Sequence, residues 1–107
     1  MIEKSEYSLL LAQKAKKDLR DIHAYIEQEL QEPQTADNVL DRIVAAIDSL
    51  SHMPRRNVLL KDAGMMQRRI RREVVDNYLI FYSINEEVKL VKIIRILYNR
   101  RDWMSII

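Results

Sequence analysis

The stretch 78–98, YLIFYSINEEVKLVKIIRILY, decides the fold class of this 107-residue chain. Tyr78–Ile84 is rich in aromatic and β-branched residues, which predicts a β-strand. Its alternate positions share one strand face: Tyr78, Ile80, Tyr82 and Ile84. Val88–Tyr98 is a longer apolar run, and its length favours a central place in a sheet. Because only Asn85-Glu86-Glu87 separates the two runs, the stretch predicts an antiparallel hairpin.

Two amphipathic helices are predicted upstream of this hairpin. The first has apolar residues spaced by three or four positions: Ala15, Leu19, Ile22, Ile26 and Leu30. It should end near Gln31, because Pro33 disfavours helical geometry in the residue before it. The second has the same spacing, with Val39 and Val44 widening its stripe: Ala36, Leu40, Ile43, Ile47 and Leu50. Thr35 is its expected N-cap and Met53-Pro54 its end, so the short link predicts an antiparallel helical hairpin.

The remaining segments complete an α+β domain. Tyr7–Ala12 predicts a first strand, Arg69–Val74 another strand, and the polar residues 55–67 a loop with the only glycine, Gly64. We therefore expect a β-α-α-β-β-β order, with the antiparallel helical hairpin packed on one face of a small, mostly antiparallel twisted sheet. A length of 107 residues suits one domain over 1–107. Periodicity predicts a core that includes Leu19, Ile26, Leu40, Ile47, Phe81 and Ile94.

Composition narrows the class of protein. The chain has no cysteine, no signal-peptide pattern at its start, and no apolar run near the ~18 residues of a membrane span. We expect a soluble, cytoplasmic protein without disulfides. Net charge is +2, but residues 1–53 carry six Lys/Arg against ten Asp/Glu, whereas residues 54–107 carry twelve against six. Arginine suits bidentate contact with phosphate or carboxylate. A solvated basic surface is the alternative, but the asymmetry follows the secondary structure, which favours a binding role.

Three pieces of the chain, within about residues 7–103, resemble the RelE/ParE family of type II toxins. The first helix contributes Ala15…Asp18-Leu19…Ile22…Tyr25-Ile26, and the second Ile43…Ile47…Leu50…Pro54. The third and most specific piece runs from Arg71 through Tyr78-Leu79-Ile80-Phe81-Tyr82 to Arg95-Ile96-Leu97-Tyr98-Asn99-Arg100-Arg101-Asp102. The resemblance implies a growth-arresting toxin that is neutralised by an antitoxin encoded beside it.

The family divides by target. Its RelE-like branch cuts mRNA in the ribosomal A site, and its ParE-like branch inhibits DNA gyrase. The long helical hairpin and the Tyr98…Arg101-Asp102 ending look closer to the ParE-like branch. A histidine often stands where this chain has Tyr98, which puts a general base at that position in doubt.

Cleavage of RNA by its own 2′-hydroxyl needs a base, an acid and cations around one phosphate. No cofactor is expected and no metal site either, because His23 and His52 lie far apart without paired carboxylates. If the chain is a ribonuclease, its candidate catalytic residues are Arg71, Arg95 and Tyr98. Arg95 should point to the open side of the sheet, opposite Ile94 and Ile96.

Binding to a target or an antitoxin needs no such constellation. We expect Arg69 and Arg71 to share one strand face. The position of Arg72 stays open: its parity places it toward the helices, and the alternative is the sheet edge, with its stem buried and its charged head in water. The candidate binding residues are Arg69, Arg71, Arg95, Arg100, Arg101 and Trp103. Three functions stay open: a ParE-like inhibitor that binds gyrase, a RelE-like endoribonuclease, and an adaptor without toxicity.

Overall fold

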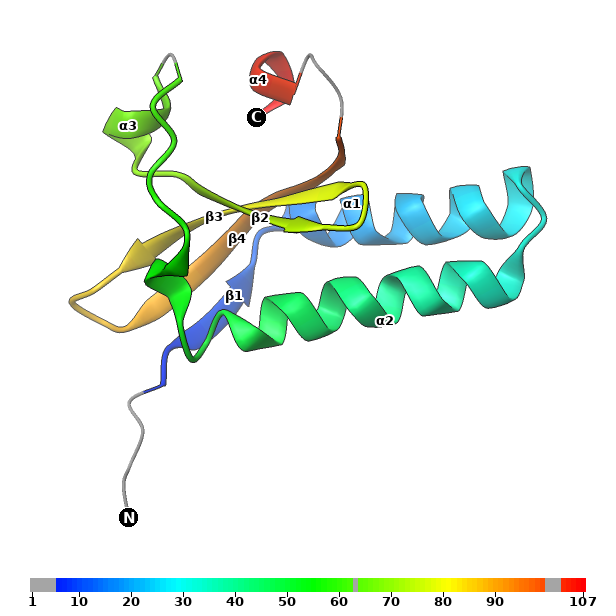
Figure 1. Ribbon diagram of the computed structural model, residues 1–107, viewed down its shortest axis with the longest axis horizontal. Helices are drawn as coiled ribbons and strands as arrows, with labels where there is room; N and C mark the ends of the chain where they lie inside the picture. Colours follow the sequence, from blue (N-terminus) through cyan, green and yellow to red (C-terminus); the bar gives the residue numbers. More distant parts are fainter. Residues whose placement is uncertain (1–5, 63, 100–102) are drawn as a thin grey trace.

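A four-stranded mixed sheet forms the framework of the protein (Figure 1). The computed structural model describes residues 6–62, 64–99 and 103–107. The strands, in their order across the sheet, are β1 (Ser8–Leu11), β4 (Leu90–Tyr98), β3 (Tyr78–Asn85) and β2 (Arg71–Val75). β1 is parallel to β4 and the other neighbours are antiparallel. The predicted α+β class and the interior position of the longest strand are confirmed.

The helical hairpin packs on one face of the sheet (Figure 1). It consists of α1 (Gln13–Ala24), a π-helical turn η1 (Tyr25–Glu29) and α2 (Pro33–Ser49). Pro33 opens α2, where its fixed φ suits the first turn and its missing N–H costs nothing. The prediction of Thr35 as N-cap is wrong, because the helix starts two residues earlier and the Thr35 hydroxyl donates to the Glu32 carboxylate at 2.9 Å. No described helix is both long and apolar enough to cross a membrane.

The main core lies between the hairpin and the sheet. Ile26 and Ile47 are buried there as predicted, whereas Leu19 and Leu40 are only partly buried. The predicted strand face is confirmed, since Tyr78, Ile80, Tyr82 and Ile84 all belong to this cluster or pack against it. Each fully buried large side chain contributes about 1.5–3 kcal/mol relative to exposure.

The other face of the sheet is covered too. A second apolar cluster consists of Met65, Ile70, Leu79, Phe81 and Trp103. It lies under α3 (Met65–Arg68) and α4 (Trp103–Ile106), two short helices on the side of the sheet away from α1 and α2 (Figure 1). Phe81 is buried as predicted, but in this cluster, 4.9 Å between ring centroids from Trp103.

A β-bulge in β4 overturns one predicted strand face. Phe81 pairs with Arg95 but Tyr82 pairs with Ile93, so Ile94 is an extra residue without a partner. One inserted residue reverses the alternation beyond it. Ile93 and Ile96 therefore face the hairpin, whereas Ile94 packs against the second cluster and does not share a face with Ile96.

Candidate functional site

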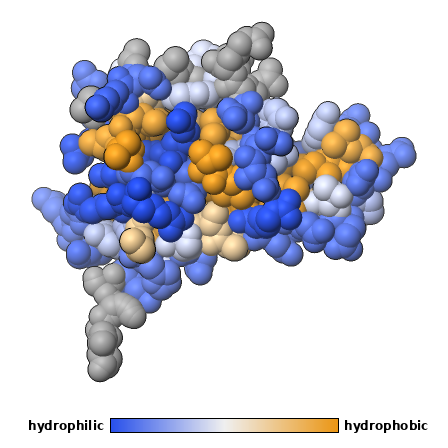
Figure 2. Space-filling model, in the orientation of Figure 1, coloured by the Kyte–Doolittle hydropathy of each residue, from blue (hydrophilic) through white to orange (hydrophobic). Residues whose placement is uncertain are grey.

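A basic cleft of about 490 Å³ opens where β3 extends beyond β2. β2 begins at Arg71, opposite Tyr82, so residues 83–85 of β3 have no β2 partner. The cleft lies between this free end of β3, the segment after α2 and the α3 segment. Its cationic lining residues are Arg55, Arg68, Arg69, Arg71 and Lys92. Strongly hydrophilic side chains gather over this end of the molecule (Figure 2).

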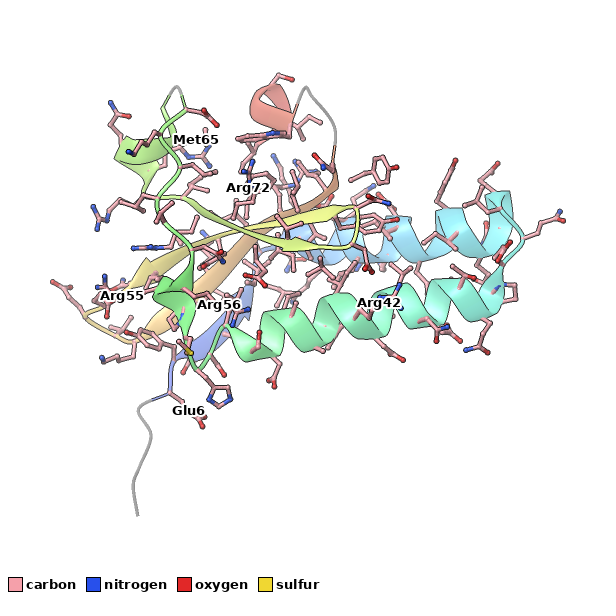
Figure 3. All side chains as sticks on the ribbon, in the orientation of Figure 1. Glu6, Arg42, Arg55, Arg56, Met65 and Arg72 are labelled. Atoms are coloured by element: carbon pink, nitrogen blue, oxygen red, sulfur yellow. The ribbon has the colours of Figure 1, made fainter. Side chains whose placement is uncertain are left out.

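Several of these cations already have partners. Arg55 points toward the β3–β4 turn (Figure 3), where its Nη2 lies 2.5 Å from the Glu86 carboxylate. Glu86 also accepts a 2.8 Å hydrogen bond from the Tyr7 hydroxyl; this bond and the Arg55 charge lower the pKa of Glu86. Arg68 donates to the Ile107 carbonyl at 2.9 Å.

Arg69 and Arg71 do not share a strand face, contrary to expectation. Arg69 is exposed, precedes the strand and has a left-handed φ of 56°. Arg71 is in register with Tyr82, whose ring faces the helical hairpin, and it donates to the Asn57 carbonyl. The prediction failed because β2 begins only after Arg69, so the parity of a strand does not apply to it.

Arg95 is tied to Asp18 of α1 and is not a free cation over the open face. Its Nε and Nη2 donate to the two Asp18 oxygens at 2.8 and 2.9 Å. Asp18 Oδ2 also accepts the backbone N–H of Ile96 at 2.9 Å, beyond the point where β1 ends. Both side chains are largely buried, with exposed fractions of 17% for Arg95 and 11% for Asp18. The hydrogen bonds to Asp18 raise the pKa of Arg95.

Tyr98 lines a different depression. A groove of about 860 Å³ runs between the helical hairpin and the β2–β3 turn, with Tyr25, Leu30, Tyr78 and Tyr98 among its lining residues. Tyr98 is half exposed and packs edge-on against Tyr78 at 5.6 Å between centroids. Burial, together with the neighbouring Tyr98, raises the pKa of Tyr78. A band of hydrophobic side chains reaches the surface toward the far end of the hairpin (Figure 2).

Trp103 is buried within its own chain. It stacks over Phe81, and the Arg72 guanidinium lies 5.5 Å from its ring centroid, beneath α4 (Figure 3). Arg72 is paired with Phe81 across the strands and thus faces the second cluster; its predicted position toward the helices is wrong. Arg100 and Arg101 lie outside the described residues.

A polar network that sequence reasoning missed ties the segment after α2 to strands β2 and β3. The buried Tyr82 hydroxyl donates to the Pro54 carbonyl at 2.7 Å and accepts from the Asn57 amide at 3.1 Å. Asn57 also donates to Glu73 at 2.6 Å, and Glu73 pairs with Arg56 at 3.0 Å. Burial raises the pKa of Tyr82. The sequence did contain one indication of this network. Tyr82 is a tyrosine on the strand face toward the core, and a buried hydroxyl needs a hydrogen-bond partner.

Each of the two histidines lies close to a carboxylate outside the basic cleft. His23 lies 2.8 Å from Asp37 and so links α1 to α2, as expected of a structural residue. His52 lies 3.6 Å from Glu6 at the surface. Neither histidine lines the basic cleft or the groove that contains Tyr98.

Comparison with known proteins shows that the sequence matches a family of toxins. A family model described as "ParE toxin of type II toxin-antitoxin system, parDE" matches residues 9–103. The fold resembles a structure of the chromosomal ParDE system from P. aeruginosa, with a TM-score of 0.71 and 19% identity over 89% of this chain and 98% of the other. It also resembles a chain of the RelBE2 complex from Mycobacterium tuberculosis, with a TM-score of 0.67 and 20% identity over 88% and 99%.

A free E. coli RelE variant aligns with a TM-score of 0.65 and 13% identity over 94% of this chain and 92% of the other. No curated protein matches the sequence. The predicted resemblance to RelE/ParE toxins is confirmed.

Proposed function

Because the chain belongs to the ParE toxin family of type II toxin–antitoxin systems, we propose that it arrests bacterial growth by binding and inhibiting DNA gyrase. Gyrase is the target that the sequence resemblance implied for the ParE-like branch. In this proposal the protein acts as a binding inhibitor, and it has no RNA-cleaving activity.

The main support for this proposal is that the three candidate catalytic residues do not surround one common site. Arg71 lines the basic cleft, Tyr98 lines the groove beside the hairpin, and Arg95 is paired with Asp18 where β4 extends beyond β1. A nuclease needs its base, acid and cations within hydrogen-bond reach of one phosphate. Tyr98 lies in a different depression from the two arginines, and Arg95 already has a carboxylate partner, so the three form no such group, which favours inhibition by binding.

One observation supports the alternative, a RelE-like endoribonuclease acting on mRNA at the ribosome. Carboxylates lie among the cations of the basic cleft, and Glu87 is exposed there. A carboxylate beside arginines can accept a proton from a 2′-hydroxyl. Glu86 is less suited to that role, because Tyr7 and Arg55 stabilise its charged form.

The proposed partner is a cognate antitoxin encoded beside the toxin, as in the ParDE and RelBE complexes. An acidic antitoxin segment would be attracted to the arginine-rich half, including Arg69, Arg100 and Arg101. Its apolar anchor is better placed in the groove around Tyr25 and Tyr98, because Trp103 is buried within its own chain. Salt should then slow association more than it hastens dissociation.

Growth assays, a gyrase supercoiling assay and an assay of mRNA integrity test the proposal. Expression of the full chain should stop growth, and co-expression of the adjacent gene should restore it. Purified protein should inhibit gyrase supercoiling while cellular mRNA stays intact. Unimpaired growth at high soluble expression would contradict the toxin function, and cleaved mRNA with normal supercoiling would favour the endoribonuclease.

Two variants separate binding from catalysis further. Tyr98→Phe removes one hydroxyl and should keep full toxicity, since binding does not depend on proton transfer. Glu87→Gln should also keep toxicity, because it removes only a proton acceptor in the basic cleft. Loss of activity in either variant, with the fold intact by circular dichroism, would support RNA cleavage. Arg95→Ala is unsuited to this purpose because it breaks the contact with Asp18.

A further inference from the structure

The basic cleft continues into a second depression on the same side of the sheet. This depression has a volume of about 240 Å³ and shares Arg68 and Lys92 with the cleft. Its lining also includes Lys14, at the start of α1, and Arg95. We define the basic strip as the lining cations of both depressions: Arg55, Arg68, Arg69, Arg71, Lys92, Lys14 and Arg95.

Some of these cations have no carboxylate partner within the protein. Arg55 pairs with Glu86, and Arg95 pairs with Asp18. Within the described parts of the chain, no carboxylate lies within salt-bridge distance of Lys14, Arg69 or Lys92, and all three are exposed. The strip therefore offers at least three unpaired cations in two adjoining hollows, and the exposed carboxylate of Glu87 lies beside them.

The lining chemistry indicates the class of ligand. Among the described residues, no aromatic side chain lines either hollow. Single-stranded nucleic acids are bound chiefly by stacking their bases on aromatic rings, which the strip lacks. Arginine and lysine without stacking rings suit the repeated phosphates of a duplex backbone, which are contacted without regard to sequence.

From these observations we propose that the basic strip binds the phosphodiester backbone of double-stranded DNA, with Arg69, Lys92 and Lys14 as its phosphate contacts. This activity goes beyond the proposed function, since it needs neither gyrase nor an antitoxin. If gyrase is the target, the strip would hold the toxin on the duplex on which that enzyme acts.

Fluorescence anisotropy of the full chain with a labelled 20-base-pair duplex of mixed sequence tests the proposal, without gyrase present. Three phosphate contacts predict a slope of about −2.7 for log K against log salt. Arg69→Gln combined with Lys92→Gln should reduce the slope by about 1.8. At 0.1 M salt the same double variant should bind about 60-fold more weakly, because each phosphate contact that forms releases about 0.9 counterion and the variant makes two fewer contacts.

A matched control removes the same charge elsewhere. Lys16→Gln with Arg20→Gln changes two exposed cations that line a hollow on the hairpin. Its affinity should stay within about twofold of the wild type. Arg69→Gly controls for misfolding of the variant. Glycine adopts a φ of 56° without strain, and the substitution removes the same positive charge as Arg69→Gln. This variant too should weaken binding.

Four results would overturn the proposal. The first is no binding at 50 mM salt, and the second is an equal loss in the strip and control variants, which would indicate unspecific attraction. The others are tighter binding of a single-stranded RNA of the same length, or of a poly-glutamate peptide, which would assign the strip to that class of ligand. None of these results depends on whether gyrase is the target.

Discussion

Replacing Asp18 with alanine should destabilise the protein far more than the same replacement of a surface carboxylate on this helix. Asp18 accepts three hydrogen bonds, two from the Arg95 guanidinium and one from the Ile96 N–H. Its removal leaves a largely buried guanidinium without a counter-charge and a backbone donor without an acceptor. Removing one partner of a buried ion pair lowers the free energy of unfolding by about 3–5 kcal/mol. Because this pair is still partly exposed, we expect a loss near the lower end, at about 3 kcal/mol.

Urea unfolding followed by circular dichroism measures this loss. With a slope of about 1.5 kcal/mol per molar urea, the midpoint of Asp18→Ala should fall by about 2 M. Asp21→Ala is the control, since Asp21 lies on the same helix and pairs with Lys17 in solvent. Such an exposed pair contributes about 0.2–1 kcal/mol.

A double-mutant cycle identifies the partner. In Asp18→Ala with Arg95→Met the unpaired charge is gone, so the double variant should be more stable than Asp18→Ala alone. The coupling free energy between the two sites should exceed about 1.5 kcal/mol. A midpoint within 0.3 M urea of the wild type for Asp18→Ala, or strictly additive single changes, would refute the reasoning that this pair holds α1 to β4.

Four further outcomes are expected. Tyr82→Phe should lower the free energy of unfolding by about 1–2 kcal/mol, because the Pro54 carbonyl loses its donor; urea unfolding measures it. The raised pKa of Tyr82 favours the neutral phenol in the folded state, so stability should be intact below pH 10 and fall as the pH rises through the native pKa, a fall that Tyr82→Phe reduces. Trp103→Ala should cost about 3 kcal/mol by opening the second cluster, and an unchanged thermal midpoint would contradict its burial there. Ile47→Ala should cost about 2–5 kcal/mol, measured in the same way, whereas the exposed Val44→Ala should cost well under 1 kcal/mol.

Most of the architecture could be predicted from local patterns. The spacing of Ile43 and Ile47 predicts the buried face of α2, and the alternation of Ile80 and Tyr82 predicts the strand face toward it. Both patterns follow from periods of 3.6 and 2, which are properties of short segments. The order of the helices and strands then permits few ways of packing them. The protein adopts the predicted one, a helical hairpin on a mostly antiparallel sheet.

The second cluster could be predicted only in part. Leu79 and Phe81 alternate with the core face, so the sequence places them on the far side of β3. It does not say that α3 and α4 return to cover them, because short helices of four residues carry no usable periodicity. The bulge at Ile94 is hidden for a similar reason, since it depends on how β4 pairs with β3.

The candidate site was the least accessible to sequence reasoning. Composition determined that the second half of the chain is basic and that arginines are numerous. Only the tertiary structure decided which of them are free. Arg95 is neutralised by Asp18, 77 positions away, whereas Arg69 is exposed because β2 begins after it. The residue type alone determines the charge of a side chain. Its partner and its direction depend on strand register and on contacts between distant segments.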